Sequence, residues 1–327
     1  MKKNLMAIPI TLGTIAGIAA GSIAGLSYYL FKLAYGRKLP KSAKKIFSMN
    51  NAPTEREKEA DERYVAQMHE TDAYIAKKDT ADMYITSFDG TQLYGKMVWA
   101  GKNVKKTVLC VHGYHGTPTA DFGGMVEYYM EHGYNVLLLD NRAHGKSEGE
   151  YLGFGWLDRL DIVMWCRRLV QILGTHSEII LAGVSMGGAA VMMASGEDLP
   201  RQVKGIIEDC GYATTVDQFK AVYPKQLSAV RDVVLHIDNI ACKVVNGYYY
   251  TSANATTALK KNSLPTLFIH GGDDKFVPTS MVYEVFDAQK GPKELYISEG
   301  AGHAQSYIVN PERYKEVVTA FLEKYKL

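Results

Sequence analysis

Cysteines are few in this sequence, and the short motifs that mark metal or nucleotide sites are missing. The 327 residues include four cysteines, far apart and without a CxxC pair, so neither a disulfide framework nor a zinc site is predicted. No P-loop, no GxGxxG after an expected strand and no HExxH occurs, and we therefore expect no cofactor and no metal. Thirty glycines and ten prolines are too few for a collagenous or disordered chain.

Acidic residues are absent from the first 45 positions, which hold eight Lys or Arg. The rest of the chain holds 29 basic and 35 acidic residues, a net charge of −6 that the whole-chain value of +2 conceals. A mildly acidic body is not the basic surface that binds nucleic acid, so no nucleic-acid partner is expected. The 47% hydrophobic content supports a large core, and the length suits one large α/β domain or two small ones.

An uncharged run of 27 residues, 5–31, lies inside this basic segment. At about 1.5 Å per residue, a helix of this length crosses a hydrocarbon core of roughly 30 Å, whereas the apolar region of a cleaved signal peptide is shorter. The run ends in the aromatic cluster from Tyr28 to Phe31 before Lys32, as is typical of a membrane interface. We predict a single-pass anchor within residues 1–45. Self-association through one glycine face of this helix is also predicted, at Gly13, Gly17, Gly21 and Gly25.

Six basic residues follow the apolar run and two precede it. The positive-inside rule then places the C-terminal body in the cytoplasm, and cysteines without evident partners agree with a reducing compartment. An exported or secreted body is the alternative. Residues 46–79 mix charges of both signs at helical spacing, which predicts a solvated helical stalk between the anchor and the domain.

From about residue 80, short apolar runs alternate with longer amphipathic segments. An opening hairpin with its turn at Asp89-Gly90, followed by strand–helix alternation, predicts an α/β domain over 80–327, with a mostly parallel eight-stranded sheet between helices. The strands are expected at Met83–Phe88, Leu93–Trp99, Thr107–Val111, Asn135–Asp140, Glu178–Val184, Gly205–Asp209, Thr266–His270 and Glu294–Ile297. A helix-like stretch of about residues 213–262 interrupts the alternation and is predicted to be a small lid.

The strongest chemical signal is Gly183-Val184-Ser185-Met186-Gly187, directly after an apolar strand and before a helix. A GxSxG sequence in this context is typical of a nucleophile elbow, because small residues let the backbone turn sharply and expose the serine Oγ. Ser185 is therefore the candidate nucleophile. The amide of Met186, one residue on, and that of Tyr114, in the loop after an early strand, are candidate donors of an oxyanion hole.

A serine hydroxyl becomes a good nucleophile only when a positioned base takes its proton and an acid orients that base. His303 follows the last expected strand, and Asp274 follows the strand before it. Both loops belong to the carboxyl ends of strands, where open α/β sheets place their sites. Asp273 is an alternative acid to its neighbour Asp274, and Asp209, at the end of an earlier strand, is a third candidate.

With these motifs in this order, the chain from about residue 80 to 327 resembles the α/β-hydrolase family, and within it membrane-anchored bacterial serine hydrolases related to prolyl-oligopeptidase-type and cinnamoyl-esterase-like enzymes. The resemblance implies Ser185 as nucleophile, Asp274 as acid and His303 as base. It also implies that Asp140–Ser147 is the loop that commonly reads DxRxxGxS in this fold, mainly structural, with Arg142 tying it down.

We expect a serine hydrolase that cleaves carboxylic esters through an acyl-enzyme. A peptidase or amidase with the same three residues is the first alternative, and a catalytically inactive, membrane-tethered binding module is the second. The apolar and tyrosine-rich lid suits an apolar or aromatic acyl group, which makes a small-molecule ester the expected substrate. Two further residues are candidates for substrate contact, His115 and Tyr248.

Overall fold

The computed structural model describes residues 25, 28–38, 55–223 and 225–327. Within them, eight strands form one sheet in the order β1-β2-β4-β3-β5-β6-β7-β8, and only the pairings of β2 are antiparallel. The strands are β1 Thr80–Thr86, β2 Gln92–Val98, β3 Lys106–Val111, β4 Asn135–Asp140, β5 Glu178–Val184, β6 Val203–Asp209, β7 Thr266–Gly271 and β8 Lys293–Ser298. The mostly parallel eight-stranded sheet expected from the sequence is confirmed, with strand ends within about three residues of prediction.

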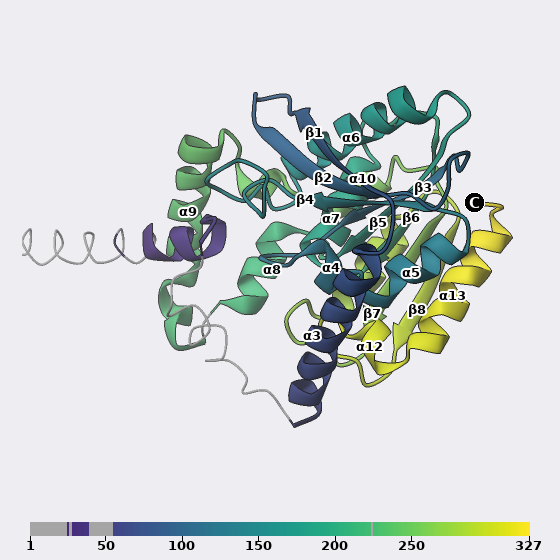
Figure 1. Ribbon diagram of the computed structural model, residues 1–327. Helices are drawn as coiled ribbons and strands as arrows, with labels where there is room; N and C mark the ends of the chain where they lie inside the picture. Colours follow the sequence, from purple (N-terminus) through teal and green to yellow (C-terminus); the bar gives the residue numbers. More distant parts are fainter. Residues whose placement is uncertain (1–24, 26–27, 39–54, 224) are drawn as a thin grey trace, which may run out of the picture.

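The central strands are almost continuously apolar, because helices cover both faces of the sheet. One face packs against α5 and α13, and the other against α6, α7 and α11 (Figure 1). The helices are α3 Glu55–Ile75, α4 Pro118–Asp121, α5 Gly123–Glu131, α6 Asp158–Leu173, α7 Met186–Ala194, α8 Thr215–Val222, α9 Arg231–Asn246, α10 Ala255–Leu259, α11 Ser280–Ala288, α12 Ser306–Val309 and α13 Pro311–Lys324.

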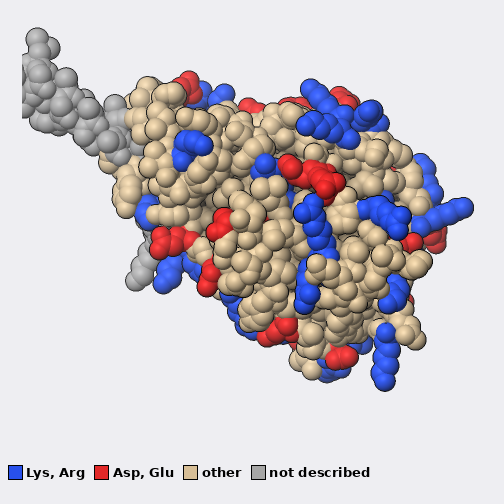
Figure 2. Space-filling view, turned by 90° about the horizontal axis from the view of Figure 1, so that it is seen from above, with Lys and Arg blue, Asp and Glu red and all other residues tan. Residues whose placement is uncertain are grey.

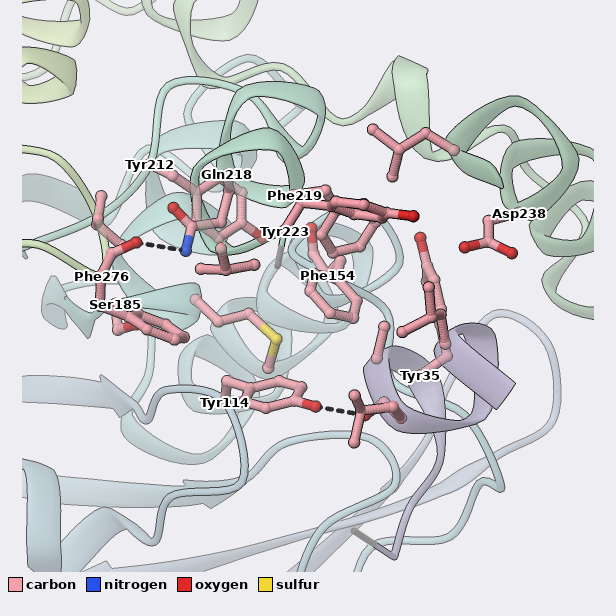
Figure 3. Close-up of a pocket in the computed structure, with 17 residues that line it drawn as sticks. Tyr35, Tyr114, Phe154, Ser185, Tyr212, Gln218, Phe219, Tyr223, Asp238 and Phe276 are labelled. Atoms are coloured by element: carbon pink, nitrogen blue, oxygen red, sulfur yellow. Dashed lines mark hydrogen bonds between the residues drawn. The ribbon is translucent and has the colours of Figure 1, made fainter. Parts of the chain in front are cut away.

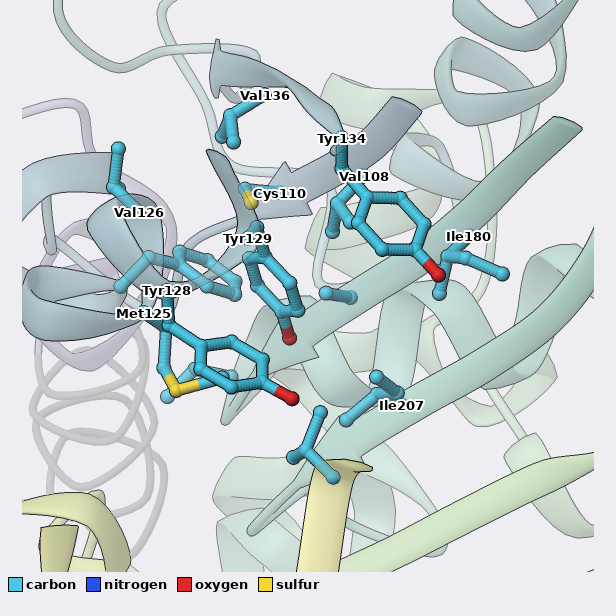
Figure 4. Close-up of a cluster of buried hydrophobic side chains, with 14 of the residues drawn as sticks. Val108, Cys110, Met125, Val126, Tyr128, Tyr129, Tyr134, Val136, Ile180 and Ile207 are labelled. Carbon is cyan, nitrogen blue, oxygen red and sulfur yellow. The ribbon is translucent and has the colours of Figure 1, made fainter. Parts of the chain in front are cut away.

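Figure 4 shows the core on the α5 side, where tyrosine and methionine side chains of α5 lie over small aliphatic residues of the strands. Tyr129 is 2% exposed and packs among Val108, Cys110 and Val136. Basic and acidic side chains are interspersed over the face seen from above (Figure 2). This pattern agrees with the mixed charge of the body and forms no single-sign patch on that face.

The charged segment before β1 forms the helix α3, as expected, but one side of this helix is packed against the domain. Ala60, Thr71 and Ile75 are buried, and α3 contacts α4, α5 and α12. The sequence misleads here because charged residues dominate the composition, while the few small and apolar residues that fall on one side provide the contact. The helix is part of the domain surface and not a free-standing stalk.

Residues 28–35 are helical and lie beside α9 (Figure 1). Tyr28 is 64% exposed, whereas Phe31 and Tyr35 are 3% and 1% exposed and belong to the same apolar cluster as α7 and α11. The aromatic residues interpreted as an interfacial belt are thus partly core residues of the domain. The ring of Tyr35 lies 4.8 Å from the rings of both Phe31 and Phe154.

None of the helices within the described residues combines the length and hydropathy that a membrane span requires. Most of the predicted anchor, including Gly13, Gly17 and Gly21, lies outside the described residues, and Gly25 lies within them. The anchor and its self-association therefore stay predictions.

The stretch of about residues 213–262, named here the helical insertion, contains α8, α9 and α10 between β6 and β7. Thr214 and Asn254 cap the N-termini of α8 and α10 with their side chains, which explains where these short helices begin. The insertion lies to one side of the sheet, with α8 and α9 near residues 28–35 (Figure 1). Residues of α8 and α9 line the same pocket as Ser185.

Candidate active site

Ser185 occupies the sharp turn between β5 and α7. Its φ of +55° lies in a region that few non-glycine residues adopt, and its amide donates to the carbonyl of Asp209 at 2.8 Å. A Cβ at Gly187 would overlap the carbonyl group of Val111, so only glycine lets α7 start this close to β3. The sequence GxSxG therefore produces the turn that holds the Ser185 side chain at the end of the sheet.

His303 and Asp274 meet Ser185 from two later loops. The Oγ of Ser185 lies 2.8 Å from Nε2 of His303, and Nδ1 of His303 lies 2.7 Å from Oδ2 of Asp274. The other carboxylate oxygen of Asp274 accepts hydrogen bonds from the amides of Phe276 and Val277, both at 2.9 Å. The three residues thus form one continuous hydrogen-bonded chain.

Charge and burial shift the pKa values of Asp274 and His303. Burial alone would raise the pKa of Asp274, but the charge of His303 and hydrogen bonds from His270 and His303 hold the pKa of that carboxyl well below its usual range. Burial alone would lower the pKa of His303, but the charge and hydrogen bond of Asp274 raise the pKa of the imidazole. A carboxylate that stays ionised is what keeps a histidine base oriented and stabilises its protonated form.

The two alternative acids lie elsewhere. Asp273 is exposed, whereas the side chain of Asp274 is fully buried beside His303. Asp209 is buried at the end of β6, where its carboxylate accepts a hydrogen bond from Ser306 at 3.3 Å. Burial raises the pKa of Asp209 to about 6. Of the three candidates, the structure brings Asp274 to the histidine.

The loop after β3 carries Tyr114, whose amide is a candidate oxyanion donor. Met186 begins α7, and amides in the first turn of a helix have no intrahelical acceptor. The preceding amide, of Gly113, donates to Oδ2 of Asp121 at 2.5 Å, and the hydroxyl of Tyr64 on α3 donates to Oδ1 of the same carboxylate. Asp121 and Tyr64, which fix this loop, have no motif in the sequence and were not anticipated.

A mostly apolar pocket opens from Ser185 (Figure 3). Three parts of the chain line it: residues 30–35, the helical insertion, and the loops around Ser185. The lining residues are Leu30, Leu33, Ala34, Tyr35, Tyr114, Phe154, Ser185, Met186, Tyr212, Gln218, Phe219, Val222, Tyr223, Leu235, Asp238, Phe276 and Val277. The hydroxyl of Tyr114 donates to the carbonyl of Leu33 at 2.6 Å. This hydrogen bond joins the loop after β3 to residues 30–35 in the pocket wall.

The two predicted substrate contacts do not line this pocket. Tyr248 is 6% exposed, and its hydroxyl donates to the carbonyl of Gly153 at 2.7 Å. This hydrogen bond joins the helical insertion to the loop before α6. The amide of His115 donates to Nε2 of His144 at 3.1 Å. The composition of the tyrosine cluster gave no signal of which ring faces the cavity.

Arg142 fixes its loop, as the resemblance implies. Its guanidinium is 5% exposed and binds the carboxylate of Asp161 through Nε at 2.7 Å and Nη2 at 2.8 Å. A third nitrogen, Nη1, reaches Asp89 in the opening hairpin at 2.9 Å. The arginine therefore joins the loop to α6 and to the hairpin, and it is not among the residues that line the pocket.

Only one group among the described residues has donor atoms close enough for a metal ion: Cys210, Asp274 and His303, whose potential ligand atoms lie within 4.8 Å of one another. Burial raises the pKa of the Cys210 thiol well above its usual range, which disfavours the thiolate that binds metals. Both ring nitrogens of His303 already have protein partners. The donor set is better suited to proton transfer than to metal binding.

Comparison with known proteins places this architecture. Residues 102–211 match the family model described as serine aminopeptidase, S33. The esterase Pf2001 of Pyrococcus furiosus superposes with a TM-score of 0.61 at 24% identity, over 78% of this chain and 96% of that protein. The chain has the α/β-hydrolase fold. The fold that the sequence motifs predicted is thus confirmed.

The sequence relatives of this chain are distant. The uncharacterized protein YqkD of Bacillus subtilis is 27% identical over 227 residues, 68% of this chain and 73% of YqkD. The putative esterase YheT of Escherichia coli is 21% identical over 238 residues, 61% of this chain and 70% of YheT. The esterase EaEST of Exiguobacterium antarcticum shares the fold of this chain, with a TM-score of 0.54 at 17% identity, over 74% of this chain and 100% of that protein.

Proposed function

We propose that this protein is a serine hydrolase that cleaves carboxylic esters of apolar acyl groups through an acyl-enzyme on Ser185. The observation that carries the proposal is the hydrogen-bonded chain from Ser185 through His303 to Asp274, with distances of 2.8 and 2.7 Å, at the mouth of a mostly apolar pocket. A serine, a base and an orienting acid in this order are the apparatus of acyl transfer.

In the proposed reaction, Nε2 of His303 takes the proton of Ser185 while Oγ attacks the ester carbonyl. The amides of Met186 and Tyr114 bind the oxyanion, the imidazolium gives its proton to the leaving alcohol, and the acyl group stays on Oγ. A water molecule then gives its proton to His303 and attacks the acyl-enzyme. His303 returns that proton to Oγ as the bond between Oγ and the acyl carbon breaks, which releases the acid and restores the serine. The ionised carboxylate of Asp274 stabilises the imidazolium in both halves of the cycle.

The pocket supports an apolar acyl group. Its cavity volume is about 100 Å³, smaller than the roughly 300–1,000 Å³ of sites that hold drug-sized ligands. A slender chain fits such a space better than a branched or multi-ring group.

Replacing Ser185 by alanine tests the proposal. We expect Ser185→Ala to abolish both labelling by a fluorophosphonate probe and hydrolysis of p-nitrophenyl esters. Ser252→Ala, at an exposed serine of the helical insertion, is the matched control and should keep both. Turnover that survives in Ser185→Ala would refute the assignment, and a wild-type protein that neither labels nor turns over would favour the inactive binding module.

A peptidase or amidase is the second candidate, because the matching family model is described as a serine aminopeptidase. The same three residues can attack an amide carbonyl. Paired substrates with the same acyl group, one a p-nitrophenyl ester and one a p-nitroanilide, distinguish the two activities. Faster turnover of the anilide would replace the ester assignment.

We also propose that the part of the apolar run 5–31 that precedes the packed segment 28–35 anchors the protein in a membrane, with the hydrolase domain on the cytoplasmic side. The length of that part and the flanking basic residues support the proposal. All four native cysteines are buried, so they serve poorly as topology reporters. Asp198→Cys places a thiol at a side chain that is 96% exposed. Labelling of that thiol by an impermeant maleimide in intact cells would contradict the cytoplasmic orientation.

A further inference from the structure

The end of the pocket away from Ser185 holds a single carboxyl group. Asp238 on α9 lies there, with Ser185 at the opposite end of the cavity (Figure 3). Its side chain is 7% exposed, and its Oδ1 has no hydrogen-bond partner among the described residues. The other residues of the pocket wall include no Asp, Glu, Lys or Arg.

A buried carboxyl without a partner is costly, because it loses its water ligands and gains nothing in return. Elsewhere in this domain the same problem is solved by pairing, since the buried Asp161 receives two hydrogen bonds from Arg142. No such cation pairs with Asp238 in the described part of the chain. Burial raises the pKa of Asp238 to about 7, so the group has both protonation states available near neutral pH.

The nearby phenol of Tyr250 does not donate its proton to the carboxyl of Asp238. Burial first, and the charge of Asp238 second, raise the pKa of Tyr250, which places this phenol close to the carboxyl. The hydroxyl of Tyr250, however, donates to the carbonyl of Leu235 at 2.6 Å. Its proton is therefore committed to the backbone of α9, and Asp238 keeps acceptor capacity for a group that enters through the pocket.

We propose that Asp238 is a distal subsite that binds a hydrogen-bond donor, a hydroxyl or an ammonium, at the far end of the acyl chain whose carbonyl is attacked by Ser185. This inference rests on the proposed function, which it deepens: the substrate is an ω-substituted acyl ester and not a plain hydrocarbon ester. The apolar wall between Ser185 and Asp238 contacts the methylenes of the acyl chain. The pocket should therefore prefer the one chain length that reaches from Ser185 to Asp238.

The test uses full-length protein and p-nitrophenyl esters in matched sets, in which each chain length is supplied unsubstituted, with an ω-hydroxyl and with an ω-ammonium. We expect the ratio of kcat/KM for the substituted over the unsubstituted ester to peak at one chain length in the wild type. In Asp238→Leu this peak should fall by about tenfold or more, because the donor then enters an apolar pocket without an acceptor. In Asp238→Asn the hydroxyl preference should largely remain and the ammonium preference should be lost.

Asp232→Asn is the control, since Asp232 is an exposed carboxylate on the same helix, and it should leave every ratio unchanged. A ratio that is identical in the wild type and Asp238→Leu at all lengths would overturn the proposal. If no ester turns over in the wild type, the proposed function fails separately. Calorimetric binding of ω-amino and ω-hydroxy fatty acids to Ser185→Ala, with and without Asp238→Leu, then decides whether the subsite exists.

Discussion

Replacing Tyr35 by alanine will open one wall of the acyl pocket and leave Ser185, Asp274 and His303 in place. The ring of Tyr35 is 1% exposed and lies against the rings of Phe31 and Phe154. Because Tyr35 also lines the cavity, its loss removes apolar contacts that an acyl chain would make with the wall formed by residues 30–35. Short acyl groups that do not reach this wall should be unaffected.

The magnitude follows from the apolar lining. Burial of a methylene group contributes about 0.8 kcal/mol, and a tenfold rate change corresponds to about 1.4 kcal/mol, so each methylene inside the intact pocket should raise kcat/KM roughly fourfold. In Tyr35→Ala, the methylenes that pass the open wall keep part of this gain. For these carbons we expect the increase per methylene to fall to about twofold, about half the contribution in free energy.

The assay is kcat/KM for p-nitrophenyl esters from acetate to dodecanoate, plotted as its logarithm against chain length. Tyr84→Ala serves as the control, because Tyr84 is 55% exposed on the edge strand β1. Thermal unfolding of both variants separates pocket effects from loss of the fold. An unchanged slope in Tyr35→Ala, or an equal loss for acetate and dodecanoate, would refute the reasoning.

Three other substitutions test the site and its support. Asp274→Asn should lower kcat/KM by about 10⁴-fold. The carboxylate raises the pKa of His303, and the histidine must be neutral to act as a base. In a pH–rate profile, the low-pH limb of the residual activity should therefore move to lower pH. Arg142→Met should cost about 3–5 kcal/mol in urea unfolding, since it leaves Asp161 buried without its partner, and adding Asp161→Leu should recover most of that loss; recovery of less than 1 kcal/mol would argue against the pair. Gly187→Ala should prevent correct folding, because the alanine methyl group would overlap the carbonyl group of Val111. The yield of soluble protein and its circular dichroism spectrum check this.

The motifs predicted the sheet and the meeting of Ser185, Asp274 and His303, because apolar strand runs and a sharp strand-to-helix turn are features of local sequence. The apolar runs of β3, β4 and β5 are buried on both faces, and a turn as strained as the one at Ser185 admits few sequences. Chain order then identified Asp274 and His303. The choice between Asp273 and Asp274 rested on resemblance alone, and it is burial that distinguishes them in the structure.

The pocket could not be predicted in the same way, because its walls come from segments distant in sequence. Phe31 and Tyr35 are aromatic residues of the kind found at a membrane interface, and nothing local indicates that Phe31 packs on Tyr151 and Tyr35 on Phe154. Asp238 is one acidic residue in an amphipathic helix, where a solvated position is the usual expectation. In the folded domain, α9 presents this residue to the pocket.

The contact between α3 and the loop after β3 affects how this protein should be divided into fragments. The family model matches from residue 102 and the expected domain begins near residue 80, yet Tyr64 on α3 donates to the Asp121 carboxylate that holds the Gly113 amide. A fragment cut at residue 80 would keep Ser185, Asp274 and His303 but would leave the Asp121 carboxylate without its phenol donor. A fragment meant to test the proposed chemistry therefore has to begin upstream of the matched region, at the helix that charge composition alone would assign to a spacer.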